Sequence, residues 1–236
     1  MNKPILATLS IAALALPGLA NATLFNRGSG LIYDDVLKIT WLQDANYAKT
    51  SGYDGDGQVN WSAANTWAAN LSYGGFNDWR LPTMVDTGTS GCNGAYTGTD
   101  CGYNVQTTSG STVYSEMASL SYDTLGNKGY CPTTGTCPQS GWGLINTGPF
   151  SNVQTNLYWS ALEYAPYPSL AWNFVFSYGS QGADYEYNEF FAWAVRPGDV
   201  GAQVPEPGVT LLLGFGLAGM VGVRRRARRP LGASVI

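Results

Sequence analysis

Two segments of the chain combine tyrosines with carboxylates, a pairing suited to binding sugars. They supply six candidate ligand-binding residues: Tyr164, Tyr167, Asp184, Tyr185, Glu186 and Tyr187. A tyrosine offers a flat apolar ring and a hydroxyl, and a carboxylate accepts hydrogen bonds from sugar hydroxyls. In the second segment acids and tyrosines alternate, which in an extended backbone places the acids on one face and the rings on the other. The alternative is that both segments are solvated hairpin loops without a ligand.

A third segment, Asp54-Gly55-Asp56-Gly57-Gln58, has the composition of a calcium loop. Alternating carboxylates on a glycine-rich loop supply the hard oxygen ligands that calcium prefers. The segment is not an EF-hand, because Val59 replaces the glycine of the sixth position and Asn65 the glutamate of the twelfth. Asp54 and Asp56 are therefore candidate calcium ligands, with a solvated turn as the alternative. No other cofactor is expected.

The four cysteines have the spacing of short disulfide loops. They are Cys92, Cys101, Cys131 and Cys137. In an oxidising compartment the economical pairing joins each cysteine to its nearest neighbour, Cys92 with Cys101 and Cys131 with Cys137, although two other connectivities are open. A zinc site is the other reading, but neither spacing is C-x-x-C and the chain has no histidine. The bridges are expected to brace a loop-rich region.

Catalysis has little support in the sequence. Without histidine there is no Ser-His-Asp triad and no histidine metal site. A carboxylate pair such as Glu163 with Glu186 has the chemistry of a glycosidase, but the sequence does not give their separation. We therefore expect a protein that is not an enzyme, with a polysaccharide-acting enzyme as the minor alternative.

The elements that position these residues are strands at both ends of the domain and one main helix. Residues 30–33 and 36–42 read as two strands around an Asp34-Asp35 turn. From Asn60, a suitable cap, the residues Trp61, Ala64, Ala68 and Leu71 fall on one face of a helix that stops at Gly74-Gly75.

The second half is rich in loops and then in strands. Residues 87–148 are dominated by Gly, Ser, Thr and Cys, with one modest helical candidate at 115–120. Residues 157–162, 171–178 and 190–196 are three strand candidates, typical of an antiparallel meander. The sequence thus predicts an α+β domain, with one main helix packed on an antiparallel sheet and long disulfide-braced loops. The tryptophans within these patterns are expected in the core: Trp41, Trp61, Trp67, Trp159 and Trp193.

Charge excludes one class of partner. Between Thr23 and Gln203 the chain has six basic and fifteen acidic residues, a net charge of −9. An acidic surface repels phosphate backbones and anionic lipid, so nucleic acid is not an expected partner.

The first 22 residues have the features of a secretory signal peptide. Lys3 gives a positive start, residues 5–16 are apolar, and Ala20-Asn21-Ala22 has the form of a cleavage site. We therefore expect export, with residues 23–203 as the single exported domain and an uncleaved anchor as the alternative.

The C-terminal end has three parts in a fixed order. Val204-Pro205-Glu206-Pro207 comes first, an uncharged run at 209–223 follows, and five arginines lie between Arg224 and Arg229. The run would reach about 22 Å as a helix, short of a hydrocarbon core of about 30 Å, and so would be a marginal anchor. The arginines are expected to stay cytoplasmic. An ordinary membrane anchor is the alternative.

This order of parts resembles the PEP-CTERM sorting signal of Gram-negative bacteria. The resemblance covers residues 204–229, leaves 230–236 as a tail, and implies processing by exosortase, a membrane enzyme. It also implies a protein held transiently in the inner membrane by its C-terminal helix and then placed outside the cell or at its surface.

The domain itself resembles the DUF1566 family, also called the Lcl C-terminal domain. Three motifs carry the resemblance: Asn77-Asp78-Trp79-Arg80-Leu81-Pro82-Thr83, Tyr158-Trp159-Ser160 and Ala192-Trp193-Ala194-Val195-Arg196-Pro197. It implies a C-type-lectin-like fold. Sulfated sugars, which a collagen-like adhesin of the family binds, do not suit the acidic domain. Arg80 and Arg196 are expected to pair with acids or backbone carbonyls rather than with ligand.

Together these features predict an exported surface or matrix protein that binds or organises extracellular polysaccharide, for example in a biofilm. A structural matrix protein without a specific ligand is the alternative.

Overall fold

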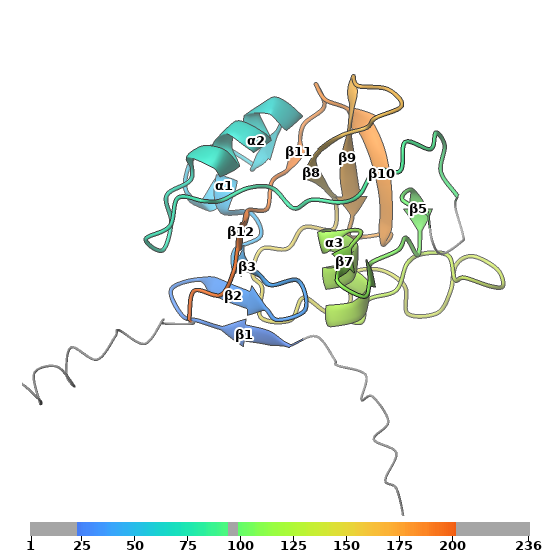
Figure 1. Cartoon of the computed structure of the whole chain (residues 1–236), viewed down its shortest axis with the longest axis horizontal. Helices are drawn as coiled ribbons and strands as arrows, with labels where there is room; N and C mark the ends of the chain where they lie inside the picture. The colour runs from blue at the N-terminus through green and yellow to red at the C-terminus, as the bar shows by residue number, and fades with distance from the viewer. Residues whose placement is uncertain (1–22, 94–98, 202–236) are drawn as a thin grey trace, which may run out of the picture. The chain divides into compact units, whose positions relative to one another are not determined.

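The computed structural model describes residues 23–93 and 99–201 (Figure 1). The predicted signal peptide and sorting tail lie outside these residues. The strands are β1 Leu24–Asn26, β2 Leu31–Asp34, β3 Ile39–Leu42, β4 Gln58–Val59, β5 Gly102–Tyr103, β6 Thr108–Ser109, β7 Thr112–Val113, β8 Leu157–Glu163, β9 Leu170–Val175, β10 Ser180–Tyr185, β11 Phe190–Phe191 and β12 Val195–Pro197. The helices are α1 Tyr47–Thr50, α2 Trp61–Asn70, α3 Glu116–Ser119 and the π-helix η1 Leu120–Thr124.

The described chain is mostly β-sheet, with few helices. One sheet has the strand order β4-β11-β8-β9-β10-β5, a second has the order β1-β2-β3-β12, and β6 pairs with β7. In the larger sheet β8, β9 and β10 are antiparallel neighbours, whereas β11 runs parallel to β8 (Figure 1). The described residues up to Gly198 belong to one compact unit.

The predicted meander needs two corrections. The predicted third strand is divided, because β11 joins the larger sheet while β12 pairs with β3 in the smaller one. β10 was not predicted, since Ser180-Gln181-Gly182-Ala183-Asp184-Tyr185 contains no β-branched residue. Its pairing with β9 along all six residues forms it. Asp184 and Tyr185 are thus strand residues and not loop residues.

The main helix is confirmed, with a shift in its buried face. The Asn60 side chain caps α2 by accepting from the Ala63 N–H at 2.9 Å. Ala64, Trp67 and Ala68 are its buried residues, whereas Trp61 is only half-buried. The helical candidate at 115–120 is also confirmed, as α3 with Ser115 as its cap.

An aromatic cluster around Trp193 joins the two sheets. The Trp193 ring lies 5.0 Å from that of Trp41 in β3 and 5.8 Å from that of Tyr158 in β8, between ring centroids. Phe150 meets Trp193 edge-on at 4.9 Å. The buried indole N–H of Trp193 donates to the Leu42 carbonyl at 2.7 Å, so its polar atom is satisfied. Trp41, Trp159 and Trp193 are fully buried, as predicted.

The three recognised motifs meet in space. Arg80 and Val195 exchange two backbone hydrogen bonds of 2.8 Å, and the Ala161 N–H donates to the Pro82 carbonyl at 2.8 Å. The Arg196 guanidinium holds Asp78 through bonds of 2.7 and 2.9 Å. These contacts give the motifs a structural role, joining the segment after α2 to both sheets.

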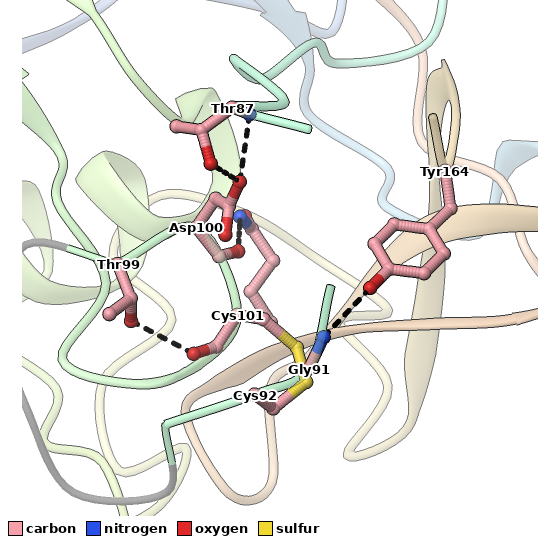
Figure 2. Close-up of a disulfide and its surroundings, with 8 residues drawn as sticks. Thr87, Gly91, Cys92, Thr99, Asp100, Cys101 and Tyr164 are labelled. Atoms are coloured by element: carbon pink, nitrogen blue, oxygen red, sulfur yellow. Dashed lines mark hydrogen bonds between the residues drawn. A yellow bond between two sulfur atoms is a disulfide. The ribbon is translucent and has the colours of Figure 1, made fainter. Parts of the chain in front are cut away.

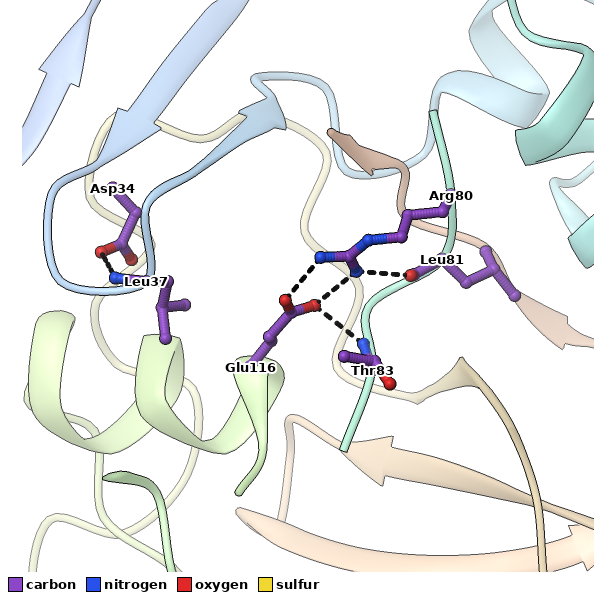
Figure 3. A network of polar contacts seen from close by, with 6 residues as sticks. All are labelled: Asp34, Leu37, Arg80, Leu81, Thr83 and Glu116. Carbon is purple, nitrogen blue, oxygen red and sulfur yellow. Dashed lines mark hydrogen bonds and ion pairs between the residues drawn. The ribbon is translucent and has the colours of Figure 1, made fainter. Parts of the chain in front are cut away.

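Arg80 is paired as predicted, and its partner is the buried Glu116 of α3 (Figure 3). Two bonds of 2.7 Å join the guanidinium to the carboxylate, which also accepts from the Thr83 N–H at 2.8 Å. Arg80 donates further to the Leu81 carbonyl.

Burial raises the pKa of Asp34, although hydrogen bonds from the N–H groups of Leu37 and Val36 lower it. The two acids anchor separate turns of the fold.

Both predicted disulfides are present. Cys92 pairs with Cys101 and Cys131 with Cys137, each bridge closing a short loop. Within residues 23–93 and 99–201, no helix has the length and apolarity needed to cross a membrane. The predicted membrane helix at 209–223 lies outside those residues, and the C-type-lectin-like fold stays a prediction.

Candidate functional site

Three exposed tyrosines lie at one end of the β9–β10 hairpin. We call Tyr167, Tyr185 and Tyr187 the tyrosine rim; their exposed fractions are 59%, 48% and 72%. The rings of Tyr185 and Tyr187 stack at 5.2 Å between centroids with an angle of 13° between their planes. The two predicted segments run side by side here, because Tyr185 pairs with Leu170 and the Glu186 N–H donates to the Ser169 carbonyl. The fold thus brings the two segments together.

Tyr164 needs a correction, because it is buried. Its ring packs edge-on against Trp172 at 4.9 Å, in a cluster with Met84 and Cys101. Its hydroxyl accepts from the Gly91 N–H at 3.1 Å (Figure 2). With its ring in the core, Tyr164 supports the rim and does not present a ring face to a ligand.

The predicted acids of the rim have different surroundings. The Asp184 carboxylate accepts from the Tyr185 N–H and from the Asn188 amide at 2.6 Å, so it shapes the turn after β10. Glu186 has one buried carboxylate oxygen without a hydrogen-bond partner among the described residues. Desolvation raises the pKa of Glu186, and the negative charge of Glu163 raises it further. The candidate carboxylate pair is therefore electrostatically coupled.

The anchor of the rim is Asp86, which the sequence did not single out. Its Oδ2 accepts from the Ala165 N–H at 2.6 Å and from the Trp172 indole N–H at 2.7 Å. Its Oδ1 accepts from the Gly88 N–H. A single aspartate thereby ties the 164–169 loop to strand β9. The sequence did not reveal this role, because Ala165 and Trp172 lie about 80 residues away from Asp86 in the chain.

The Cys92–Cys101 bridge is connected to Asp86 through the neighbouring Thr87, and Figure 2 shows the bridge with Thr87 and Asp100. Thr87, next to Asp86, donates both its N–H and its hydroxyl to the Asp100 carboxylate, at 2.8 and 2.6 Å. Asp100 directly precedes the bridged Cys101. The disulfide loop is therefore joined through Thr87 to Asp86, and Asp86 in turn holds the loop that carries part of the rim.

The Asp54–Asp56 loop is held by its own carboxylates. Asp54 accepts from the N–H groups of Asp56 and Gly57 at 2.9 and 2.8 Å, and these bonds lower its pKa. Asp56 accepts from the backbone and side chain of Gln58. Among residues 23–93 and 99–201, no group of three or more acids or cysteines is placed to hold a metal ion. The calcium site stays a prediction.

Comparison with known protein families gives two matches. The Lcl C-terminal domain matches residues 30–196, and the PEP-CTERM protein-sorting motif matches residues 203–226. No curated protein and no solved structure matches the chain.

Proposed function

The chain belongs to the Lcl C-terminal domain family, and we propose that its domain binds extracellular polysaccharide through the tyrosine rim. The PEP-CTERM motif implies that the protein is exported and sorted by exosortase. The partner is therefore sought outside the cell, and polysaccharide is the class that exposed tyrosine rings with nearby carboxylates suit. The proposal includes no catalytic step and no cofactor.

The observation that carries the proposal is the exposed, supported ring pair of Tyr185 and Tyr187. Large exposed aromatic side chains on a rigid support are typical of binding surfaces. Here β10, Asp86 and the Cys92–Cys101 bridge supply the support. Tyr187 is the most exposed of the rings, at 72%. The neutral ring faces suit a sugar better than the anionic polymers that a net charge of −9 would repel.

The test is a comparison of Tyr187→Ala with Tyr53→Ala, a matched change at a tyrosine that is 49% exposed but far from the rim in the chain. The probe is exopolysaccharide extracted from the producing bacterium. Tyr187→Ala should weaken binding about tenfold, the loss expected for one aromatic contact, and Tyr53→Ala should not. Equal affinities of the two variants would reject the rim as the binding site.

A second candidate function rests on the coupled pair Glu163 and Glu186. A carboxyl group whose pKa is raised by burial and by a second carboxylate has the properties of a general acid in a glycosidase. This candidate predicts release of soluble sugar from the same polysaccharide, and loss of that release in Glu163→Gln. Binding without any release of sugar by the wild-type protein would reject it.

A further inference from the structure

A second aromatic surface lies at the opposite end of the β9–β10 hairpin. We call Tyr130, Trp142 and Tyr178 the turn cluster. The rings of Trp142 and Tyr178 stack at 5.5 Å with an angle of 21°, and Tyr130 meets them edge-on at 4.8 and 5.7 Å. Tyr178 is 46% exposed and Trp142 is 36% exposed. Like the tyrosine rim, this surface contains a stacked pair of aromatic rings, here a tryptophan with a tyrosine.

An open groove of about 650 Å³ adjoins the turn cluster. Most of its lining residues are polar, among them Asn104, Gln106, Asp123, Lys128, Thr133 and Gln139. The groove and the cluster share the segment 128–130, because Lys128 pairs with Trp142 in a β-bridge and the Tyr130 N–H donates to the Tyr178 carbonyl at 2.7 Å. The groove and the rings are therefore neighbours on the surface, although the rings themselves do not line the groove.

The walls of the groove are held in place. The Asn104 amide donates to the Cys131 carbonyl at 2.9 Å, next to the Cys131–Cys137 bridge. The Tyr122 hydroxyl donates to the Gly179 carbonyl at 2.6 Å, which fixes the turn that carries Tyr178. The Gln139 amide donates to the Gly129 carbonyl at 2.7 Å. Such a preorganised wall lowers the entropy lost on binding.

The chemistry of the groove suits an uncharged oligosaccharide. Its charged lining residues are one acid, Asp123, and one base, Lys128, so their formal charges cancel in a domain that is otherwise strongly acidic. The other polar groups are amides and hydroxyls, which hydrogen-bond sugar hydroxyls, while the exposed rings suit the apolar face of a sugar. The volume is within the usual range for ligand sites.

We propose that the turn cluster and its groove are a second polysaccharide-binding surface, so that one domain cross-links two polysaccharide chains. This inference rests on the proposed function of the rim. The two surfaces are separated by the length of β9, whose six residues span about 20 Å. At this separation the two surfaces bind different sugar units, and two separate polysaccharide chains can occupy them at once. The domain then organises the matrix as well as binding it.

The test is the light scattering of the same extracted exopolysaccharide when the purified protein is added. Wild-type protein should bind and raise the scattering, because each domain joins two chains. Tyr178→Ala should still bind through the rim but lose the rise in scattering, since a domain with one binding surface cannot join two chains. Ile145→Ala, a change at a residue that is 70% exposed near Trp142, should behave as wild type.

A second variant blocks the groove without removing a ring. Thr133 is exposed on the groove wall, so Thr133→Arg fills the space from a position that does not support the fold. It should lose cross-linking as Tyr178→Ala does. Full cross-linking by both variants would overturn the second surface. Wild-type protein that binds without cross-linking would also overturn it and leave the proposed function intact, whereas wild-type protein that does not bind would overturn the proposed function.

Discussion

Three N–H groups from Arg80 and Thr83 converge on the Glu116 carboxylate, which is 4% exposed as a residue. A buried carboxylate is tolerated only when such donors replace water. The family motif at 77–83 therefore depends on an acid that the motif does not contain. The prediction that Arg80 pairs with an acid is confirmed, but the identity of the acid required the fold.

Glu116→Gln should destabilise the protein by about 2–3 kcal/mol, because the amide brings an NH₂ group against the Arg80 donors and removes the charge that pairs with them. Urea unfolding with the disulfides intact measures the effect. Glu189→Gln, a change at an exposed glutamate, is the matched control and should have almost no effect. A loss of stability no larger than that of the control would show that the pair contributes nothing.

Glu186 should make the free energy of unfolding fall as pH rises. Its pKa in the folded protein is raised above the ordinary value of 4.5 by desolvation and by Glu163, so folding disfavours its charged form. Below 4.5 both states hold the proton and the group contributes nothing. As pH rises from 4.5 through the folded pKa the unfolded state loses its proton more readily, and the protein loses stability.

The measurement is the difference in unfolding free energy between wild type and Glu186→Gln from pH 3 to pH 8. The variant should gain relative to wild type across this window and keep the gain at neutral pH. A difference that is flat with pH would contradict the raised pKa.

At the scale of elements, sequence patterns predicted the helix and the disulfides, which depend on residues close together in the chain. The apolar spacing and the Asn60 cap were sufficient for α2, and short spacing favoured the two cysteine pairs that the structure shows, although two other connectivities were open. β10 was missed because long-range pairing with β9, not composition, makes it a strand. Tyr164 was predicted at the surface for a similar reason. Its burial depends on contacts with Gly91 and Trp172 that form only in the folded chain.

Removing the Cys92–Cys101 bridge should loosen the rim in particular. The double change Cys92→Ser and Cys101→Ser should cost about 2–3 kcal/mol, from the loop-closure entropy of a nine-residue separation. It should also speed hydrogen exchange of the Ala165 N–H, which Asp86 holds beside the bridged loop. Hydrogen exchange resolved by residue measures this.

The control is the double change Cys131→Ser and Cys137→Ser, which removes a bridge of similar loop length away from the rim. It should lower global stability by a similar amount and leave local opening at Ala165 unchanged. Equal acceleration of Ala165 exchange in both variants would show that the Cys92–Cys101 bridge has no specific role at the rim.

At the scale of the whole molecule, the domain and the sorting motif are separate segments of the chain. The Lcl C-terminal domain occupies residues 30–196 and the PEP-CTERM motif 203–226, so they follow each other without overlap. Residues 23–203 have a net charge of −9, whereas five arginines lie at 224–229, so the two parts carry opposite charge. The sorting signal could be predicted from the sequence because it is a linear motif. A binding surface could not, because folding brings its residues together.

Glu206→Ala in the full chain should block processing by exosortase and leave uncleaved precursor in the inner membrane, because Glu206 is the only charged residue of the Pro-Glu-Pro motif. Fractionation of the producing cells followed by blotting measures precursor and product. Gln203→Ala, two residues before the Pro-Glu-Pro tripeptide, is the control and should be processed normally. Normal release of Glu206→Ala protein would contradict sorting through this motif.

The most direct test of polysaccharide binding is a titration of the purified wild-type protein against exopolysaccharide from its own producer, in calcium and then in chelator. Saturable binding that is equal in both conditions is the predicted result, because the rim uses rings and hydrogen bonds rather than a metal. Loss of binding in chelator would instead assign a role to Asp54 and Asp56. Absence of saturable binding in either condition would contradict the proposed function and favour a structural protein without a specific ligand.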